Sequence, residues 1–252
     1  MKALVQRAMG VAGVPLARLL RPVGIHPPVS RDAFRAMIPQ DVLELGPFDT
    51  PFVPDAFYFD ILDQDQLRVR ATEHGRNPDG VPKIHYTGRL STIERTFDAV
   101  VSSHVVEHTP DLIGHLEEVA SLLRPGGAYF LIVPDKRYCC DHFLTETTQA
   151  EVFNGRGREK PAIDAVVDHL TRTAHNSALK HWVGIHGEPS EQPRARYEIQ
   201  AAERGEYVDV HQWIFTPSSF KAIIESVGVF PKVQVFDTAW ADFEFMAVLS
   251  GK

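Results

Sequence analysis

Residues 97–137 read FDAVVSSHVVEHTPDLIGHLEEVASLLRPGGAYFLIVPDKR, and this stretch predicts one strand–helix–strand unit. The β-branched run at 97–102 predicts the first strand. Thr109-Pro110-Asp111 predicts the helix start, with Thr109 as the N-cap hydroxyl, a proline at the first helical position and a carboxylate favoured by the helix dipole. Apolar residues then recur at three- and four-residue steps until Pro125-Gly126-Gly127 ends the helix. The continuous apolar run at 128–133 predicts a central strand covered on both faces.

Similar runs lie on both sides of this unit. Further strands are predicted at 41–45, 56–61, 81–86, 233–236 and 243–249. A second hydroxyl–proline pair, Thr216-Pro217, predicts another helix, which ends at Gly228. Strands that alternate with helices indicate right-handed βαβ units, so the sequence predicts an α/β fold with a doubly wound, mostly parallel sheet. The last two strands are close enough in sequence to form an antiparallel hairpin.

The sequence predicts a basic N-terminal arm, residues 1–38, and one domain, residues 39–252. The first 35 residues hold six Lys or Arg side chains and one Asp. An amphipathic helix on an anionic membrane surface, a covering helix and a flexible arm are all compatible with this pattern. Arg7 and Arg18 interrupt its apolar run, so neither a signal peptide nor a membrane span is expected. Regular alternation disappears at 135–210, which is predicted to be a helical and irregular insertion.

The composition is that of a soluble globular protein, with 44% apolar and 23% charged residues in 252. The net charge of −7 makes a nucleic-acid partner unexpected, because binding to a phosphate backbone needs Lys and Arg contacts. The two cysteines, Cys139 and Cys140, are adjacent and cannot form a disulfide framework, which favours a reducing, cytoplasmic location. The basic arm is also compatible with peripheral contact at the inner face of the membrane. The oligomeric state stays open, with a homodimer among the alternatives.

In a doubly wound sheet, ligands bind beyond the carboxyl ends of the strands, where the strand order reverses. The turn after the first predicted strand carries Gly46, and the second strand is followed by Asp60, which can accept hydrogen bonds from a ribose diol. A dinucleotide fingerprint would need glycine where Phe48 and Pro51 stand. An adenosine ligand that carries a sulfonium and an amino acid in place of phosphates therefore fits better, and Glu44 could attract its positive end.

At these motifs the chain resembles a class I S-adenosylmethionine-dependent methyltransferase. The resemblance rests on VLELGPF (42–48), YFDI (58–61), FDAVVSSHVVEHTPD (97–111), LLRPGGAYFLIVPDKR (122–137) and the closing hairpin. It covers roughly residues 40–137 and 209–250 and implies a Rossmann-like sheet and S-adenosylmethionine as the cofactor. The chain departs from the family in two places: its glycine-rich turn keeps only Gly46, and the turn at 86–90 lacks the acid that often reads adenine.

The resemblance also implies which residues bind the cofactor. Glu44 and Gly46, with Pro47 and Phe48 in the same turn, fall where the methionine part is held. Asp60 falls at the ribose hydroxyls and Ile61 where an apolar side chain packs on adenine. Ser103 and His104 fall where the cofactor passes toward the acceptor.

Within the broad family, GPF, SHVVEHTPD and PDKRY most resemble methyltransferases of bacterial surface-polysaccharide and other sugar pathways, which implies a sugar or glycan hydroxyl as the acceptor. Removing the hydroxyl proton needs a His or a carboxylate close to it. His108, Asp135 and His142 are the candidates, because they follow the fourth and fifth strands or stand in the adjoining insertion. The alternatives are a helix-preceding histidine, an Asp135–Arg137 ion pair and a surface histidine.

The insertion is predicted to bind the acceptor, the alternatives being a lid or a dimer interface. The side chains suited to sugar stacking and hydrogen bonding are Trp182, Arg194, Arg196 and Tyr197.

Two other functions remain open from the sequence. One is a non-catalytic binding or scaffold protein on the same fold, favoured by the reduced glycine turn. The other is a zinc hydrolase, because His104-Val-Val-Glu107-His108 matches H-x-x-E-H. That motif needs a helix, and here Val105 and Val106 are predicted to continue a strand. On one helix, His169, His175, His181 and His186 would scatter around the axis, so no metal ligands are assigned; Mg²⁺ at Asp135 or Asp141 is compatible but not required.

Overall fold

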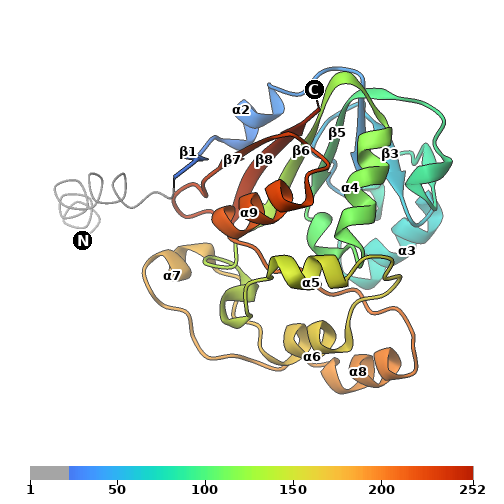
Figure 1. The fold of residues 1–252 in the computed structure, drawn as a ribbon. Coiled ribbons are helices and arrows are strands. Elements are labelled where there is room, and N and C mark those ends of the chain that lie inside the picture. Colours follow the sequence, from blue (N-terminus) through green and yellow to red (C-terminus); the bar gives the residue numbers. More distant parts are fainter. Residues whose placement is uncertain (1–22, 252) are drawn as a thin grey trace.

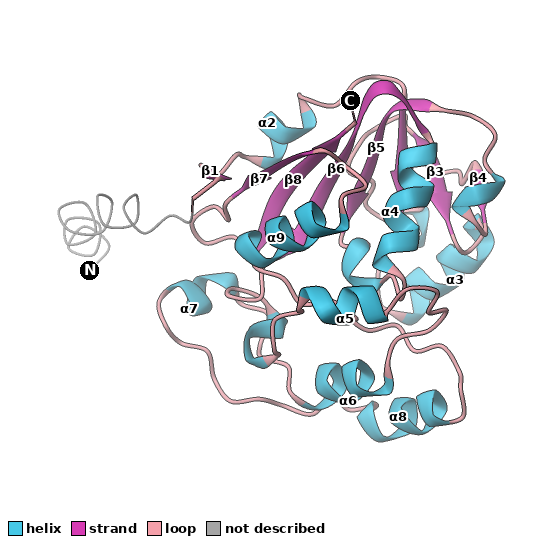
Figure 2. Cartoon of the chain, viewed as in Figure 1, coloured by secondary structure: helices cyan, strands magenta, loops and turns pink. Residues whose placement is uncertain are grey.

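The computed structural model describes residues 23–251 and folds them around one eight-stranded sheet (Figures 1 and 2). Its strands are β1 Ile25–His26, β2 Val42–Leu45, β3 Phe57–Asp60, β4 Tyr86–Thr87, β5 Phe97–Ser103, β6 Leu123–Pro134, β7 Lys232–Phe236 and β8 Glu244–Ser250. The strand order is β1-β7-β8-β6-β5-β2-β3-β4. Only β8 runs antiparallel to its neighbours, β6 and β7, among the described strands. The predicted α/β fold, with a mostly parallel sheet and an antiparallel C-terminal hairpin strand, is confirmed.

Helices cover both faces of this sheet (Figure 2). They are α2 Arg31–Arg35, α3 Gln64–Glu73, α4 Leu112–Ser121, α5 Gln149–Asn154, α6 Ile163–Thr171, α7 Ala178–Trp182, α8 Ala195–Glu203 and α9 Pro217–Val227. Successive residues of a strand point to opposite faces, and the core divides accordingly. Leu43 and Val100 pack with α4 and α9 on one face, whereas Val42 and Val101 pack with Phe34 of α2 on the other.

The predicted start of α9 is confirmed in detail. Thr216 is the N-cap, Pro217 occupies the first turn, and Thr216 and Ser219 form a reciprocal capping box. Gly228 ends the helix in the left-handed conformation, with φ 73°.

Residues 135–210, between β6 and the segment that returns to α9, contain α5 to α8. Helices α6 and α8 lie at the end farthest from the sheet (Figure 1) and share a small core of their own. Its buried members are Val166, Leu170, Ala195, Ala201, Val208 and Val210.

Three local predictions are wrong. The strand expected at 81–86 shrinks to β4, because Pro82 has no N–H to donate to a ladder. Helix α4 is capped by Asp111, whose carboxylate accepts from Gly114 N at 2.8 Å, while the Thr109 hydroxyl donates instead to the Val106 carbonyl. Strand β6 already pairs with β5 at Leu123, so Leu122, and not the Pro-Gly-Gly run, ends the helix.

A fourth difference matters for the site. Val105 and Val106 do not continue β5, because His104 has φ 55° and turns the chain away from the sheet. Residues Val106–His108 then form a 3₁₀ turn.

The amphipathic run predicted at 3–20 lies outside the described residues. The rest of the predicted arm joins the domain: β1 pairs in parallel with β7, and α2 buries Phe34 against the sheet. In the part of the chain that the structure describes, no helix has the length and apolar character needed to cross a membrane.

Candidate functional site

The carboxyl ends of β2, β3, β5 and β6 lie side by side at one edge of the sheet. Strands β2 and β5 are neighbours, and the strand order runs outward from them in both directions. A crevice at such a reversal point is where open α/β sheets bind ligands. The turns that follow these four strands therefore form the candidate site.

The turn after β2 approaches the turn after β5 closely at Gly46. A Cβ atom on Gly46 would lie 2.7 Å from Val105 Cγ2, and its φ of 63° is a conformation that favours glycine. Phe48 also has a positive φ, 45°, at the position where a dinucleotide fingerprint would carry glycine. Phe48 therefore has a backbone conformation typical of glycine although its side chain is aromatic. The Phe48 ring stays near the guanidinium of Arg76, which also holds Asp49 with bonds of 2.7 and 3.1 Å.

Glu44 is buried and ties down the same turn. Its two carboxylate oxygens accept from Phe52 N at 2.6 Å and from Val53 N at 2.8 Å. Burial raises the pKa of Glu44 to about 7, although these backbone donors and Arg35 act in the opposite direction. Glu44 thus shapes the turn that would surround the methionine part, and its direct contact with the cofactor stays a prediction.

Asp60 and Ile61 end β3 and begin the following turn. Asp60 Oδ1 accepts from Leu62 N at 3.1 Å, and burial raises the pKa of its carboxyl. Ile61 is 62% exposed, so its side chain is free to pack on a flat ligand. Both positions are compatible with the predicted ribose and adenine contacts, which stay predictions.

Ser103 ends β5, and His104 follows it and contacts Glu244 at the start of β8, although β6 lies between the two strands. His104 Nε2 lies 2.9 Å from Glu244 Oε2, and Arg31 pairs with the same carboxylate. His104 Nδ1 is 3.6 Å from the buried Glu107. The two histidines of the H-x-x-E-H motif therefore flank Glu107 in a 3₁₀ turn, where a strand was expected.

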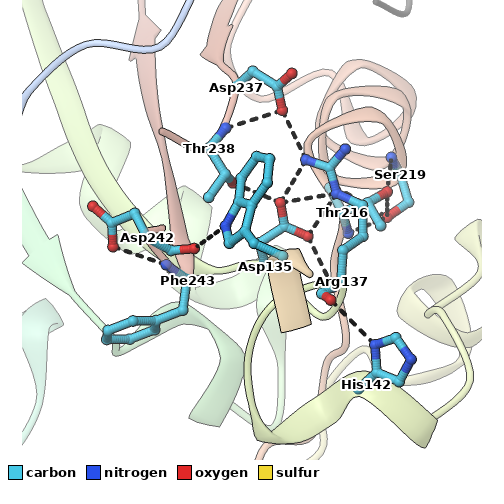
Figure 3. A network of polar contacts seen from close by, with 10 residues as sticks. Asp135, Arg137, His142, Thr216, Ser219, Asp237, Thr238, Asp242 and Phe243 are labelled. Carbon is cyan, nitrogen blue, oxygen red and sulfur yellow. Dashed lines mark hydrogen bonds and ion pairs between the residues drawn. The ribbon is translucent and has the colours of Figure 1, made fainter. Parts of the chain in front are cut away.

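Asp135 follows β6 and is fully buried in the network drawn in Figure 3. Its oxygens accept from Arg137 Nε at 2.9 and 3.0 Å, from a terminal Arg137 nitrogen at 2.6 Å and from the Thr238 hydroxyl at 2.6 Å. Arg137 also donates to Asp237 at 2.7 Å. The alternative of an Asp135–Arg137 ion pair is what the structure shows.

The other two candidate bases are histidines, each with its Nδ1 atom close to an oxygen atom. His142 Nδ1 is 3.1 Å from the Arg137 carbonyl oxygen, and burial lowers the pKa of His142. His108 Nδ1 is 2.8 Å from Asp209, a residue that the sequence analysis did not single out.

Three of the four histidines that were predicted to scatter, His175, His181 and His186, gather, whereas His169 lies apart beside His211. His142, His181 and His186 each offer a ring nitrogen within 4.8 Å of the others, and the His175 ring is tilted against that of His181, with ring centroids 4.3 Å apart. The prediction failed because it assumed one helix, whereas the chain leaves α6 after Thr171 and starts the separate α7.

Asp209 and His211 are the functional candidates that the sequence analysis missed. Asp209 faces His108, and His211 donates from Nδ1 to Asp141 at 2.7 Å. A signal was present, because polar residues two apart in the extended run Asp209-Val210-His211 point to the same side. His211 also lines a cavity of about 310 Å³ against α5 and α6, which none of the predicted cofactor-binding residues lines.

The side chains proposed for the acceptor separate into two places. Trp182 of α7 stacks on Tyr138, with centroids 3.9 Å apart and rings 6° from parallel, and Trp240 lies 5.1 Å from Trp182. Tyr197, in contrast, lies on α8 at the far end of the insertion, where it is 68% exposed (Figure 1). Helix α8 therefore does not reach the aromatic group, which consists of Tyr138, Trp182 and Trp240.

Comparisons with known structures return S-adenosylmethionine-dependent methyltransferases at low similarity. One from Thermotoga maritima shares 10% identity over 88% of this chain and 87% of its own, with a TM-score of 0.45. The N-terminal domain of EvdMO1, solved in the presence of SAH and D-fucose, shares 16% identity over 88% of this chain and 82% of its own, with a TM-score of 0.43. The chain spans 55% of the length of a Nostoc punctiforme protein, which covers 87% of this chain at 11% identity and a TM-score of 0.43. No curated protein matches the chain.

The family comparison is decisive. A family model described as a methyltransferase domain matches residues 12–229, most of the chain. The sheet agrees with this match. The strand order reverses between β2 and β5, and β8 lies between β6 and β7 and is the one antiparallel strand of the described sheet. The cofactor of this family is S-adenosylmethionine. The chain belongs to the class I S-adenosylmethionine-dependent methyltransferases.

Proposed function

We propose that this methyltransferase transfers the methyl group to a hydroxyl oxygen of a sugar or glycan. The observation that carries the proposal is that α7 brings a candidate base and an aromatic surface close together through two adjacent residues, His181 and Trp182. His181 lies 5.1 Å from His142, a candidate base, and Trp182 stacks on Tyr138 within an aromatic group. Trp240 of this group is 52% exposed, and an exposed aromatic face suits the apolar face of a sugar ring.

His142 is the proposed general base. The Arg137 carbonyl can only accept a hydrogen bond, so His142 Nδ1 carries the proton and Nε2 keeps its lone pair. Burial lowers the pKa of His142, which keeps the imidazole neutral near pH 7. Asp135 is then a positioning residue, because it holds Arg137 and thereby the carbonyl that selects this tautomer of His142.

The cofactor supplies an electrophilic methyl carbon when bound. Glu44, Gly46, Pro47 and Phe48 are proposed to surround its methionine part. Asp60 and Ile61 are proposed to hold its ribose and adenine, and Ser103 and His104 to line the passage to the acceptor.

The acceptor oxygen must lie in line with the methyl carbon and the sulfur, which is mainly a task of orientation. His142 Nε2 would take up the proton that the hydroxyl loses when its oxygen receives the methyl group from the cofactor.

Two measurements test the proposal in order. Calorimetric titration with S-adenosylmethionine and its demethylated product tests the cofactor site first. The protein is then incubated with ¹³C-methyl cofactor and a panel of nucleotide sugars and glycans, and NMR identifies the labelled atom. A methyl group on a sugar oxygen supports the proposal, and one on nitrogen or carbon contradicts it. Cofactor binding without turnover on any acceptor would favour the non-catalytic alternative.

A matched pair of variants tests the base. His142→Gln should lower kcat at least about 100-fold, the usual contribution of a general base, with little change in cofactor affinity. Tyr197→Phe on the exposed α8 is the control and should keep full activity. Equal activities of the two variants would exclude His142 as the base.

A further inference from the structure

Glu107 is a buried carboxylate without a hydrogen-bond donor. Its side chain is 1% exposed, and neither oxygen accepts a hydrogen bond from any described residue. Two ring nitrogens lie close to Oε1: His104 Nδ1 at 3.6 Å and His108 Nε2 at 3.9 Å. Burying a carboxylate in this way is costly unless another positive group compensates it. A positive group beside Glu107 would compensate this burial.

Two imidazoles converge on this carboxylate from different parts of the chain. His108 follows Glu107 in the 3₁₀ turn, and His211 belongs to the segment that returns from the insertion. Backbone N–H groups of Gln212 and Trp213 donate to the Glu107 carbonyl at 2.7 and 3.1 Å, which fixes that segment against the turn. Glu107, His108 and His211 each offer one ligand atom, and these atoms lie within 4.8 Å of one another.

Each of these imidazoles has an aspartate beside its Nδ1 atom. His108 Nδ1 lies 2.8 Å from Asp209, and His211 Nδ1 lies 2.7 Å from Asp141. A carboxylate beside Nδ1 favours the proton on that atom and leaves Nε2 with a lone pair. Metal-binding histidines almost always have such an outer partner on the other ring nitrogen. Histidines that only fill space would not need an aspartate beside Nδ1.

We propose that Glu107, His108 and His211 bind a divalent transition-metal ion, with Asp209 and Asp141 orienting the two imidazoles. Two imidazoles and one carboxylate suit Zn²⁺, Co²⁺, Mn²⁺ or Fe²⁺ better than Mg²⁺ or Ca²⁺, which prefer oxygen ligands. The ion supplies the positive charge that Glu107 requires. Three protein ligands leave a coordination position for water or another oxygen ligand. His211 also lines the cavity against α5 and α6, whereas Glu107 and His108 do not, and the inference does not depend on the proposed acceptor.

A proton on His211 is the rival source of positive charge. The neighbouring Asp141 raises the pKa of His211 to about 10 against the effect of burial. With that proton, His211 would form an ion pair with Asp141 and Glu107 and would bind no metal. Direct metal titration separates the two, because only the metal site takes up a stoichiometric ion.

The experiment uses the tag-free full chain after removal of metals by a chelator. Zn²⁺ is titrated by calorimetry, and Co²⁺ is titrated by its visible absorption, which reports the ligand geometry. One equivalent of each should bind. Glu107→Gln should weaken this binding by at least about 100-fold, since even the loss of an outer partner costs 10- to 100-fold. Asp209→Asn should weaken it by about 10-fold.

The second histidine group provides the control. His186→Gln removes one member of the group His142, His181 and His186 and should leave the binding unchanged. Glu107→Gln removes an uncompensated buried charge, so it should fold, and its metal-free melting temperature should equal or exceed that of the wild type. Zn²⁺ should raise the melting temperature of the wild type and not that of Glu107→Gln. No stoichiometric binding, or binding that survives Glu107→Gln and is lost in His186→Gln, would overturn the assignment.

Discussion

Arg137 donates hydrogen bonds from Nε and a terminal nitrogen to the carboxylate of Asp135, at 2.6 to 3.0 Å, where β6 ends. The same residue presents its carbonyl to His142 Nδ1 (Figure 3). A buried ion pair is therefore coupled through one residue to the tautomer of the proposed base. The Arg137 backbone N–H and the Thr238 hydroxyl donate to the same carboxylate, so four donor groups compensate its burial.

Asp135→Asn should destabilise the protein by about 3–5 kcal/mol, because it leaves the half-buried Arg137 without its main counter-ion. The matched control is Asp237→Asn, which removes a more exposed partner of the same guanidinium and should cost about 1 kcal/mol or less. Urea unfolding measures both. Equal losses in the free energy of unfolding would show that the buried Asp135 pair stabilises the protein no more than the more exposed Asp237 pair.

Gly46→Ala tests the close approach between the turns after β2 and β5. The added methyl group would lie 2.7 Å from Val105 Cγ2, so we expect a loss of about 1–3 kcal/mol from overpacking, added to the conformational strain. Gly126→Ala is the control, because its φ of 82° gives similar strain and no atom lies within 4 Å. Combining Gly46→Ala with Val105→Ala should recover the clash contribution. Thermal unfolding that shows no difference between Gly46→Ala and Gly126→Ala contradicts the packing argument.

Glu44 makes stability depend on pH in a direction opposite to that of a salt-bridged carboxylate. Its pKa is about 7 in the folded chain and near 4.5 when unfolded. Its contribution is complete below pH 4.5 and declines as pH rises toward 7, because only the unfolded chain has then released the proton. The decline is at most about 3 kcal/mol. Glu44→Gln should remove it, so the stability difference between wild type and variant should change between pH 4.5 and 7 and stay constant above.

The sheet was predictable because each strand carries its own signal. The run at 128–133 is apolar on both sides of the chain, as burial on two faces requires, and the runs at 42–45 and 97–102 are mostly apolar with Glu44, Asp98 and Ser102 as exceptions. The helix α3 was missed because its sequence, QDQLRVRATE, buries only Leu67 and Ala71 and shows little apolar periodicity. The short β1 was missed because two residues cannot display a pattern.

The site was predictable only where residues follow strands directly. Asp60 and Ser103 were placed at the ends of their strands in this way, and their contacts with the cofactor stay predictions. The contacts between His108 and Asp209, and between Asp141 and His211, join residues 101 and 70 positions apart, since 209 − 108 = 101 and 211 − 141 = 70. Such pairs depend on how the insertion folds back. The left-handed turn at His104 was likewise invisible, because a strand and a turn are equally compatible with Val105-Val106.

Asp60 provides the sharpest test of the cofactor site. Asp60→Ala should weaken the binding of S-adenosylmethionine by about 1.5–3 kcal/mol, the usual value of hydrogen bonds to a charged group, and should do so equally for the demethylated product, because both carry the ribose. Asp63→Ala is the matched control: Asp63 caps α3 three residues later, so its loss should cost about 1 kcal/mol of stability and leave cofactor affinity unchanged. If Asp60 holds the ribose, calorimetric titration shows weaker cofactor binding only for Asp60→Ala. Urea unfolding shows the loss of the helix cap for Asp63→Ala. Unchanged affinity in a folded Asp60→Ala protein would remove Asp60 from the cofactor site.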